Sequence, residues 1–361
     1  MLMHVQIDCK NWQGWRLTTL KKIAAELGLS PATVSRALNG FPEVNVGTRA
    51  RVAEAALRLK YRPNQVAQKL VTGRSGMIGM VLRSAADAAM DPSFFQVMTG
   101  LSQRLADHDV DLVFHAVPGG DEVAPYRRLV AKNLLDGFIL NAPKLNDPRI
   151  AFLREEGIPL VVHGRSEDAP DYAYYDIDNL GLAFDSARLL LDLGHRRIAL
   201  LNGQPGFAYA EARRRGFLLA MGERMLRVPE RFIQQDQPTE DYGYRAALAC
   251  LSDPEPPTAF VASNTFVAAG ILAAVADKGL TVGDDVSIIG HDDAVPRPRG
   301  LDTLPALTVT RSPLVQACTP LADKIHALLA GTPSAELQTI ARTELIIRAT
   351  TGPIHGALPW T

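Results

Sequence analysis

The chain has 361 residues, of which 47% are hydrophobic and 21% charged, and its formal net charge is −1. This length allows more than one domain and a sizeable core, and the composition is that of an ordinary globular protein. No apolar run is long enough to cross a bilayer, and Asp8 and Lys10 stand where a signal peptide needs its apolar centre. We therefore expect a cytoplasmic protein with no membrane contact. The cysteines at positions 9, 250 and 318 are far apart and form no CxxC pair, which predicts neither a disulfide framework nor a metal site.

Residues 17–40 predict two short helices separated by a tight turn. Thr19 is a candidate cap for the first helix, and Gly28 supplies the left-handed residue that ends it. Ser30 is a candidate cap for the second helix, with Pro31 at its first position. A third helix is predicted over residues 47–60. Together these elements predict a helix-turn-helix.

The outward face of the second helix is small at its start and polar further on, which suits a major groove. That face consists of Pro31, Ala32, Thr33, Ser35, Arg36 and Asn39. From residue 16 to residue 76 there are eleven Lys and Arg against three acids, which leaves −9 for the rest of the chain. A basic head on an acidic body favours nucleic acid as the partner of the head, over the alternative of a surface helical hairpin.

A short ordered segment lies between the head and the remainder of the chain. The sequence PNQVAQKL follows Arg62, contains good helix formers and ends in the helix-breaking run TGRSG. An eight-residue helix is marginal in water and needs a partner to persist. We interpret residues 63–75 as a hinge helix and linker; a plain linker would explain the Gly and Ser residues but not the helix formers.

From Gly76 onward, strand-like apolar runs alternate with helical patterns in two series. The first series has strands at 77–82, 110–117, 137–142 and 159–164, with helices at 93–110, 123–135 and 147–157. The second has strands at 196–203, 258–263 and 286–291, with helices at 186–194, 211–225, 243–251 and 266–279. Continuous apolar strands separated by helices predict parallel sheets covered on both faces, and two series predict two doubly wound subdomains.

Five motifs give the chain a resemblance to the lactose-repressor (LacI) family of bacterial transcription regulators. They are IAAELGLSPATVSRALNG, YRPNQVAQKL, SGMIGMV, LGHRRIALLNG and SIIGHDD, and they run in the family's order. The resemblance implies an α/β fold in which an all-α helix-turn-helix head is joined by a hinge helix to a body like that of the periplasmic sugar-binding proteins. The expected parts are a disordered arm (1–16), the DNA-binding domain (17–62), the hinge (63–75), an effector-binding and dimerisation domain of two subdomains (76–353) and a tail (354–361).

The resemblance also implies a homodimer on a palindromic operator of double-stranded DNA. Thr19, Lys21, Thr33, Ser35 and Arg36 would contact bases or phosphates in the major groove, with Pro31 and Ala32 at positions that influence operator choice. The hinge helices of two subunits would pair in the minor groove, where a leucine wedges between base pairs. The residue at that place is Leu70, with Asn64, Val66, Ala67 and Lys69 around it.

Effector contacts are expected beyond the carboxyl ends of the strands, where ligands bind in open α/β sheets. The candidate residues are Phe94, Phe95, Asn141, His163, Arg165, Arg213, Asn264 and Asp292. Guanidinium, carboxylate and aromatic groups together suit a neutral mono- or disaccharide, although each residue singly also fits a helix cap, a surface charge or a core aromatic. Arg213 and Asp292 match family positions that hold sugar hydroxyls, whereas Thr265 stands where many members have an Asp. VVHGRS, YYDIDN, GHDD and TVTRSPL resemble a subgroup associated with α-glucosides.

Two other classes of protein share this kind of body. An enzyme is not favoured, because no GxGxxG or GxxxxGK[ST] follows a strand and no GxSxG is present. A periplasmic sugar receptor would carry a signal peptide and no basic head. We therefore predict a repressor of carbohydrate-utilisation genes that needs no cofactor and is released from its operator by a sugar. A corepressor-dependent regulator with a non-sugar effector would share every motif and stays open as the alternative.

Overall fold

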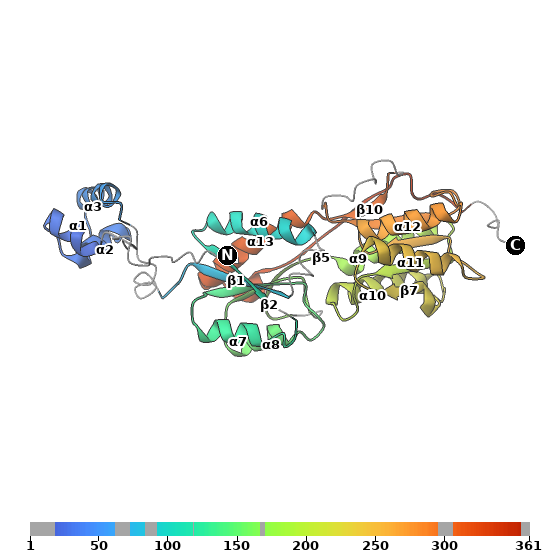
Figure 1. Cartoon of the computed structure of the whole chain (residues 1–361), viewed down its shortest axis with the longest axis horizontal. Coiled ribbons are helices and arrows are strands. Elements are labelled where there is room, and N and C mark those ends of the chain that lie inside the picture. Colours follow the sequence, from blue (N-terminus) through green and yellow to red (C-terminus); the bar gives the residue numbers. More distant parts are fainter. Residues whose placement is uncertain are drawn as a thin grey trace, which may run out of the picture. The chain divides into compact units, whose positions relative to one another are not determined.

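The computed structural model describes residues 19–61, 73–83, 92–117, 119–166, 170–294 and 306–354 (Figure 1). The chain divides between Ser75 and Gly76 into two compact units, a head and a body, and each has its own hydrophobic core. The predicted arm at 1–16, nearly all of the predicted hinge and residues 355–361 of the predicted tail lie outside the described residues.

The head consists of helices α1 (Leu20–Leu27), α2 (Pro31–Leu38) and α3 (Val46–Arg58). Its core is formed by fully buried apolar side chains from all three helices, among them Ile23, Val34 and Val52. Gly28 ends α1 with a φ of 64°, and the Ser30 hydroxyl caps α2 by accepting a hydrogen bond from the Thr33 N–H at 3.0 Å. The side chain of Thr19 stands at the start of α1 but makes no capping hydrogen bond, so that predicted role is wrong.

The body contains two lobes, each with a six-stranded sheet between helices. The sheet of the first lobe runs in the order β11-β5-β4-β3-β1-β2, and every pair of neighbours is parallel. Its strands are β1 (Met77–Arg83), β2 (Asp111–Val117), β3 (Gly137–Asn141), β4 (Leu160–His163), β5 (Ala173–Ile177) and β11 (Gln338–Ala341). Helices α6 (Pro92–Ala106) and α13 (Cys318–Leu329) cover one face, and α7 (Ala124–Ala131) and α8 (Pro148–Glu155) cover the other (Figure 1).

The sheet of the second lobe runs in the order β12-β10-β9-β8-β6-β7. Its strands are β6 (Ile198–Asn202), β7 (Ile233–Gln235), β8 (Ala259–Ala262), β9 (Ser287–Asp292), β10 (Thr308–Arg311) and β12 (Glu344–Ile346). Helices α9 (Asn179–Asp192) and α10 (Ala208–Glu223) pack on one face, and α11 (Glu240–Leu251) and α12 (Thr265–Asp277) pack on the other. The described chain passes between the lobes after β5, after β10 and after β11.

Every helix and strand predicted for the body is present, and the two doubly wound lobes confirm the predicted fold class. One detail differs, because β12 pairs with β10 in the antiparallel direction and the second sheet is therefore mixed. The strands that the sequence did not predict are short or lie at the passages between lobes: β5, β7, β10, β11 and β12. Three to five residues in such places carry too few apolar positions to show a period.

Candidate functional site

The predicted DNA-reading face of the head lies on the side of α2 that faces away from the core. Val34 and Ala37 are buried on the inner side. Of the residues predicted to contact DNA, Thr19, Lys21, Pro31, Ala32, Arg36 and Asn39 are exposed, and Thr33 and Ser35 are half-buried. The Asn39 amide donates to the Ser35 carbonyl oxygen at 2.9 Å and so closes the end of its own helix. Asn64, Val66, Ala67, Lys69 and Leu70, the predicted minor-groove residues, lie outside the described residues.

A cavity of about 1060 Å³ lies between the two lobes of the body. Its wall contains residues at the carboxyl ends of parallel strands, which is where ligands bind in open α/β sheets. Asn141 and His163 end β3 and β4, and Asn264 follows β8. Of the predicted effector residues, Asn141, His163, Arg165, Arg213 and Asn264 line this cavity. The side chain of Phe94 lies outside the described residues.

Two of the predicted effector residues, Phe95 and Asp292, are absent from the lining of this cavity. Phe95 is 67% exposed on α6 and is absent from the lining. Asp292 is turned away, because its carboxylate accepts a hydrogen bond from the Ala294 N–H at 2.8 Å and lies 3.7 Å from Nε of Arg311. The carboxylate on the wall is that of the next residue, Asp293, and side chains alternate between faces along a strand.

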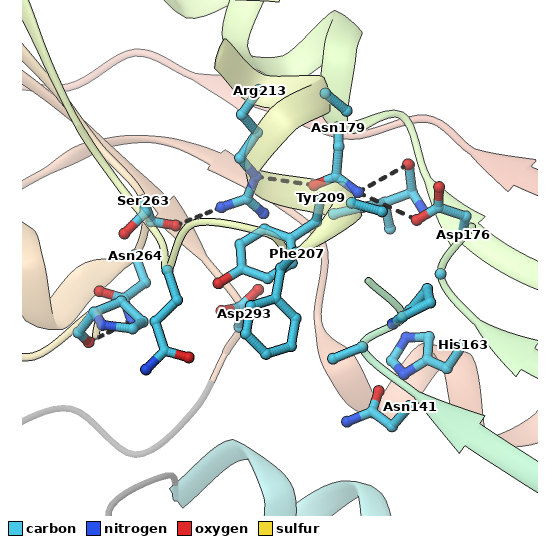
Figure 2. Close-up of a pocket in the computed structure, with 18 of the residues that line it drawn as sticks. Asn141, His163, Asp176, Asn179, Phe207, Tyr209, Arg213, Ser263, Asn264 and Asp293 are labelled. Carbon is cyan, nitrogen blue, oxygen red and sulfur yellow. Dashed lines mark hydrogen bonds between the residues drawn. The ribbon is translucent and has the colours of Figure 1, made fainter. Parts of the chain in front are cut away.

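Arg213 is held at the back of the cavity by two hydrogen bonds. Its Nε donates to Oδ1 of Asn179 at 2.9 Å, and its Nη1 donates to the Ser263 carbonyl oxygen at 2.7 Å (Figure 2). The guanidinium also lies over the ring of Tyr209, 5.2 Å from its centroid. Asn179 in turn donates to Oδ1 of Asp176 at 3.2 Å, so a chain of polar contacts leads from α10 to the end of β5. These contacts fix the guanidinium plane before any ligand arrives.

The charged groups on this wall are balanced. Burial raises the pKa of Asp176, and the hydrogen bond from Arg165 Nε at 2.9 Å only partly offsets that effect. Burial alone would also raise the pKa of Asp293, but the nearby His291 and Arg213 bring it below the usual value. Oδ1 of Asp293 lies 2.9 Å from Nε2 of His291. Both carboxylates therefore face positive or polar partners inside the protein.

His163 is a neutral polar group of the wall. Burial lowers the pKa of its imidazole to about 4, so the ring carries no charge near pH 7. Its Nδ1 and the Oγ of Ser263 are buried and have no hydrogen-bond partner among the described residues. A buried polar atom without a hydrogen-bond partner is costly, so a ligand that forms a hydrogen bond with it gains binding free energy. Both atoms belong to residues that line the cavity.

The aromatic residues of the wall are Phe207, Tyr209, Phe266 and Tyr175. The rings of Phe207 and Tyr209, 5.9 Å apart between centroids, lie between Asn264 on one lobe and His163 with Asn141 on the other (Figure 2). The sequence did not single out Phe207, Tyr209, Asp176 or Asn179 as wall residues, whereas Asp293 follows the predicted strand at 286–291 together with Asp292. Phe207 lies in the loop after β6 and Tyr209 in the first turn of α10, so a search of the segment beyond that strand end could have found both.

Comparison with known proteins gives the family. The head matches the description "Bacterial regulatory proteins, lacI family" over residues 19–64, and residues 187–351 match a periplasmic binding protein-like domain. The HTH-type transcriptional regulator AglR of Rhizobium meliloti (strain 1021) is 42% identical over 341 residues, which cover 94% of this chain and 96% of AglR. The chain belongs to the LacI family of bacterial regulatory proteins.

Other known proteins are similar to this chain over most of its length. RafR of Escherichia coli, also an HTH-type transcriptional regulator, is 33% identical over 89% of this chain and 94% of its own length. The lac repressor dimer bound to operator and the anti-inducer ONPF shares the fold with a TM-score of 0.76, at 24% identity over 93% of this chain and all of that one. The CelR–cellobiose complex does so with a TM-score of 0.68, at 24% identity over 92% of this chain and 99% of that one.

The relatives decide between the predicted classes. They are transcriptional regulators, so the prediction of a DNA-binding regulator in place of an enzyme is confirmed. In the part of the chain that the structure describes, no helix has both the length and the apolar character needed to cross a bilayer.

Proposed function

We propose that this protein is a homodimeric repressor of carbohydrate-utilisation genes, released from a palindromic operator when a neutral sugar binds between the lobes of its body. In this role it acts in the cytoplasm, where bacterial operator DNA lies. The observation that carries the proposal is the cavity wall, which joins fixed hydrogen-bonding groups to aromatic faces within a space of about 1060 Å³.

The balance of charge favours a neutral effector over an anion. Arg165 is paired with Asp176, the charge of Arg213 is countered by Asp293, and His163 is neutral. An anionic ligand would therefore meet carboxylates as well as guanidinium groups. Sugar hydroxyls can donate to the carboxylates and accept from the guanidinium groups at once.

The size and the aromatic content of the cavity favour a disaccharide. Small-molecule pockets span roughly 300–1,000 Å³, and this cavity of about 1060 Å³ is slightly larger than that range. The rings of Phe207 and Tyr209 offer flat apolar faces to the C–H side of a pyranose. A related solved regulator, CelR, is in complex with cellobiose, which supports a sugar of this size. The motifs shared with the α-glucoside subgroup make α-linked disaccharides the first to test.

The head supports the DNA half of the proposal. Arg36 and Lys21 are exposed and make no hydrogen bond or ion pair with the described residues, so both side chains are available to DNA. The exposed start of α2 adds the partial positive charge of a helix N-terminus near the phosphates. Two such heads in a homodimer match the two halves of a palindrome.

The first experiment selects a palindromic operator from random DNA and follows binding of the full-length protein by fluorescence anisotropy. It is repeated with neutral mono- and disaccharides and with uronates and sugar phosphates as anionic controls. We expect one neutral sugar to weaken operator binding by about 5- to 150-fold, and operator to weaken binding of that sugar by the same factor. A sugar that strengthens operator binding would instead make the protein a corepressor-dependent regulator, and a phosphorylated or acidic effector would overturn the argument from charge.

Variants then assign the DNA contacts. Arg36→Ala should reduce operator affinity by about 1–3 kcal/mol if the guanidinium contacts a base. Arg58→Ala is the matched control, because Arg58 lies on α3 and pairs with Glu26 away from the α2 face. Leu70→Ala should abolish most specific binding and leave the fold intact; unchanged operator affinity would remove the hinge from the proposal.

A further inference from the structure

The two lobes are joined by a short antiparallel backbone bridge. Lys144, in the loop after β3, pairs with Phe207, which precedes α10 in the other lobe. The Leu145 N–H donates to the Gly206 carbonyl oxygen at 3.1 Å, and the Ala208 N–H donates to the Pro143 carbonyl oxygen at 3.0 Å. We call residues 143–145 and 206–208 the lobe clasp.

The first half of the lobe clasp is held in place by a buried ion pair. Asp147 accepts hydrogen bonds from the Lys144 N–H at 2.8 Å, from the Arg149 N–H at 2.9 Å and from Nε of Arg149 at 2.9 Å. The side chain of Asp147 is fully buried and that of Arg149 is 7% exposed. Nη2 of Arg149 also donates to the carbonyl oxygen of Ala142. The carboxylate thus holds the backbone of Lys144, within the clasp, and its partner Arg149 holds the carbonyl group of Ala142, just before the clasp.

The same loop contains two residues with a left-handed backbone, of which Ala142 is strained, whereas asparagine at position 146 is a type that adopts this conformation more readily. Ala142 and Asn146 have φ values of 46° and 50°, the left-handed region that side chains other than glycine rarely adopt. Such conformations persist only where the surrounding structure determines them, and they concentrate at sites with a function. They flank residues 143–145 on both sides, so the strain is located where the loop turns to meet the other lobe.

The second half of the lobe clasp carries an aromatic ring of the cavity. Phe207 has φ −79° and ψ 136°, an extended conformation that lets its backbone join the bridge. Its side chain lines the cavity beside Tyr209. The backbone that joins the lobes is therefore the backbone that aims this ring.

We propose that the lobe clasp holds the two lobes of the body together in the absence of effector and positions Phe207, with Asp147 and Arg149 as its positioning pair. The second part rests on the proposed function, since it requires an effector that contacts Phe207. The proposal that the clasp holds the two lobes together does not depend on the proposed function. Both backbone hydrogen bonds form when the two lobes close. Loss of one of them should therefore lower the ratio of closed to open molecules by about 2- to 10-fold.

Ala208→Pro removes one clasp donor with little effect on α10. Ala208 is the first residue of that helix, where proline is favoured, and the extended Phe207 has the conformation that a residue before proline prefers. Ala208→Ser is the matched control, because it keeps the N–H. Asp147→Asn tests the clasp from the other lobe, since it weakens the ion pair that orders the loop.

The readout is the distance between the lobes in full-length protein without sugar, measured by pulsed electron paramagnetic resonance. Spin labels are placed at Leu134→Cys and Leu219→Cys, which are 52% exposed and lie in different lobes. Cys9 is replaced by serine, Cys250 and Cys318 are buried, and labelled chains are diluted into unlabelled protein so that only distances within one chain are read. We expect a second, displaced distance population in Ala208→Pro and Asp147→Asn but not in Ala208→Ser. If Ala208→Pro and Asp147→Asn both give the same distribution of distances as the parent protein, the proposal is overturned.

The sugar identified above tests the positioning of Phe207. Its affinity should fall in Ala208→Pro and in Asp147→Asn by the factor by which the measured fraction of closed molecules falls. If the distance between the lobes changes but the sugar affinity does not, the clasp does not position Phe207. The proposal that the clasp holds the lobes together would still stand. If no sugar binds the parent, the proposed function fails, while the distances still decide whether the clasp holds the lobes.

Discussion

Replacing Arg213 by methionine should destabilise the body strongly, because this guanidinium is part of its interior. Arg213 is 8% exposed, and it donates to Asn179 and to the Ser263 carbonyl oxygen from Nε and Nη1. Methionine keeps much of the length and apolar volume of the side chain. The change therefore removes the hydrogen bonds and the charge with little loss of packing.

The size of the effect follows from what is left behind. A hydrogen bond from a charged group contributes about 1.5–3 kcal/mol, and two are lost. The Asn179 and Ser263 oxygens stay buried without their donor, and Asp293 loses a countercharge that lowers its pKa. Breaking one side of such a buried network costs about 3–5 kcal/mol, which includes these effects. For the body, residues 76–361, that corresponds to a fall in Tm of roughly 5–8 °C.

The assay is thermal unfolding of the full-length protein followed by circular dichroism, with the transition of the body as the readout. Arg214→Met on the same helix is the control, because the side chain of Arg214 is 40% exposed and its ion pair with Glu211 at 3.5 Å lies on the surface. Such surface changes are usually within about 0.5 kcal/mol. Arg213→Lys keeps the charge but lacks the planar guanidinium group with its several donors. Its melting temperature should therefore lie between those of Arg213→Met and Arg214→Met. If Arg213→Met melts within about a degree of Arg214→Met, the guanidinium does not organise this wall.

Three further outcomes test other parts of the structure. Ser30→Ala should destabilise the head by about 1 kcal/mol because it removes the cap of α2, whereas Ser30→Asp keeps an acceptor; equal urea midpoints for both would contradict the capping role. His163 has its pKa lowered to about 4 by burial, so the unfolded chain binds a proton that the native protein does not between pH 6.5 and 4. Stability should therefore be lost as pH falls, by roughly 2 kcal/mol at pH 5, and His163→Asn should lack this part of the loss; a parallel pH dependence in the variant would show that His163 is not neutral in the fold. Gly216→Ala should destabilise by about 1–3 kcal/mol, because its Cβ would lie 2.0 Å from the Leu180 carbonyl oxygen, while Gly222→Ala on the same helix meets nothing and should be neutral or slightly stabilising. Similar melting temperatures for the two glycine variants would mean that α9 and α10 can separate freely.

The head shows how far local sequence can reach. Gly28 and Ser30 determine where two helices end and begin, since the left-handed turn and the cap depend only on neighbouring residues. The helical spacing of α2 predicts Val34, Ala37 and Leu38 on its inner side; Val34 and Ala37 are buried, whereas Leu38 at the end of the helix is 36% exposed. Thr19 is the exception, because whether a side chain at the capping position turns toward the first N–H groups is not determined by its identity.

The body required more than local information at the level of single side chains. The alternation of strands and helices predicted both lobes, because continuous apolar strands must be covered on two faces. It could not decide between Asp292 and Asp293, since a shift of one residue at the end of β9 exchanges the two faces. It also had no means of finding Asn179, whose role comes from its contacts with Asp176 and Arg213 on other elements.

The sequence by itself determined the family, the order of the elements and the strand ends at which the cavity forms, because these depend on periodicity and on short motifs. Only the tertiary structure decided which side chains share the cavity wall and that residues 143–145 meet residues 206–208 across the lobes. Those contacts join segments about sixty positions apart through backbone N–H and carbonyl groups. Every residue except proline carries both groups, so no side-chain pattern reveals which of them will pair.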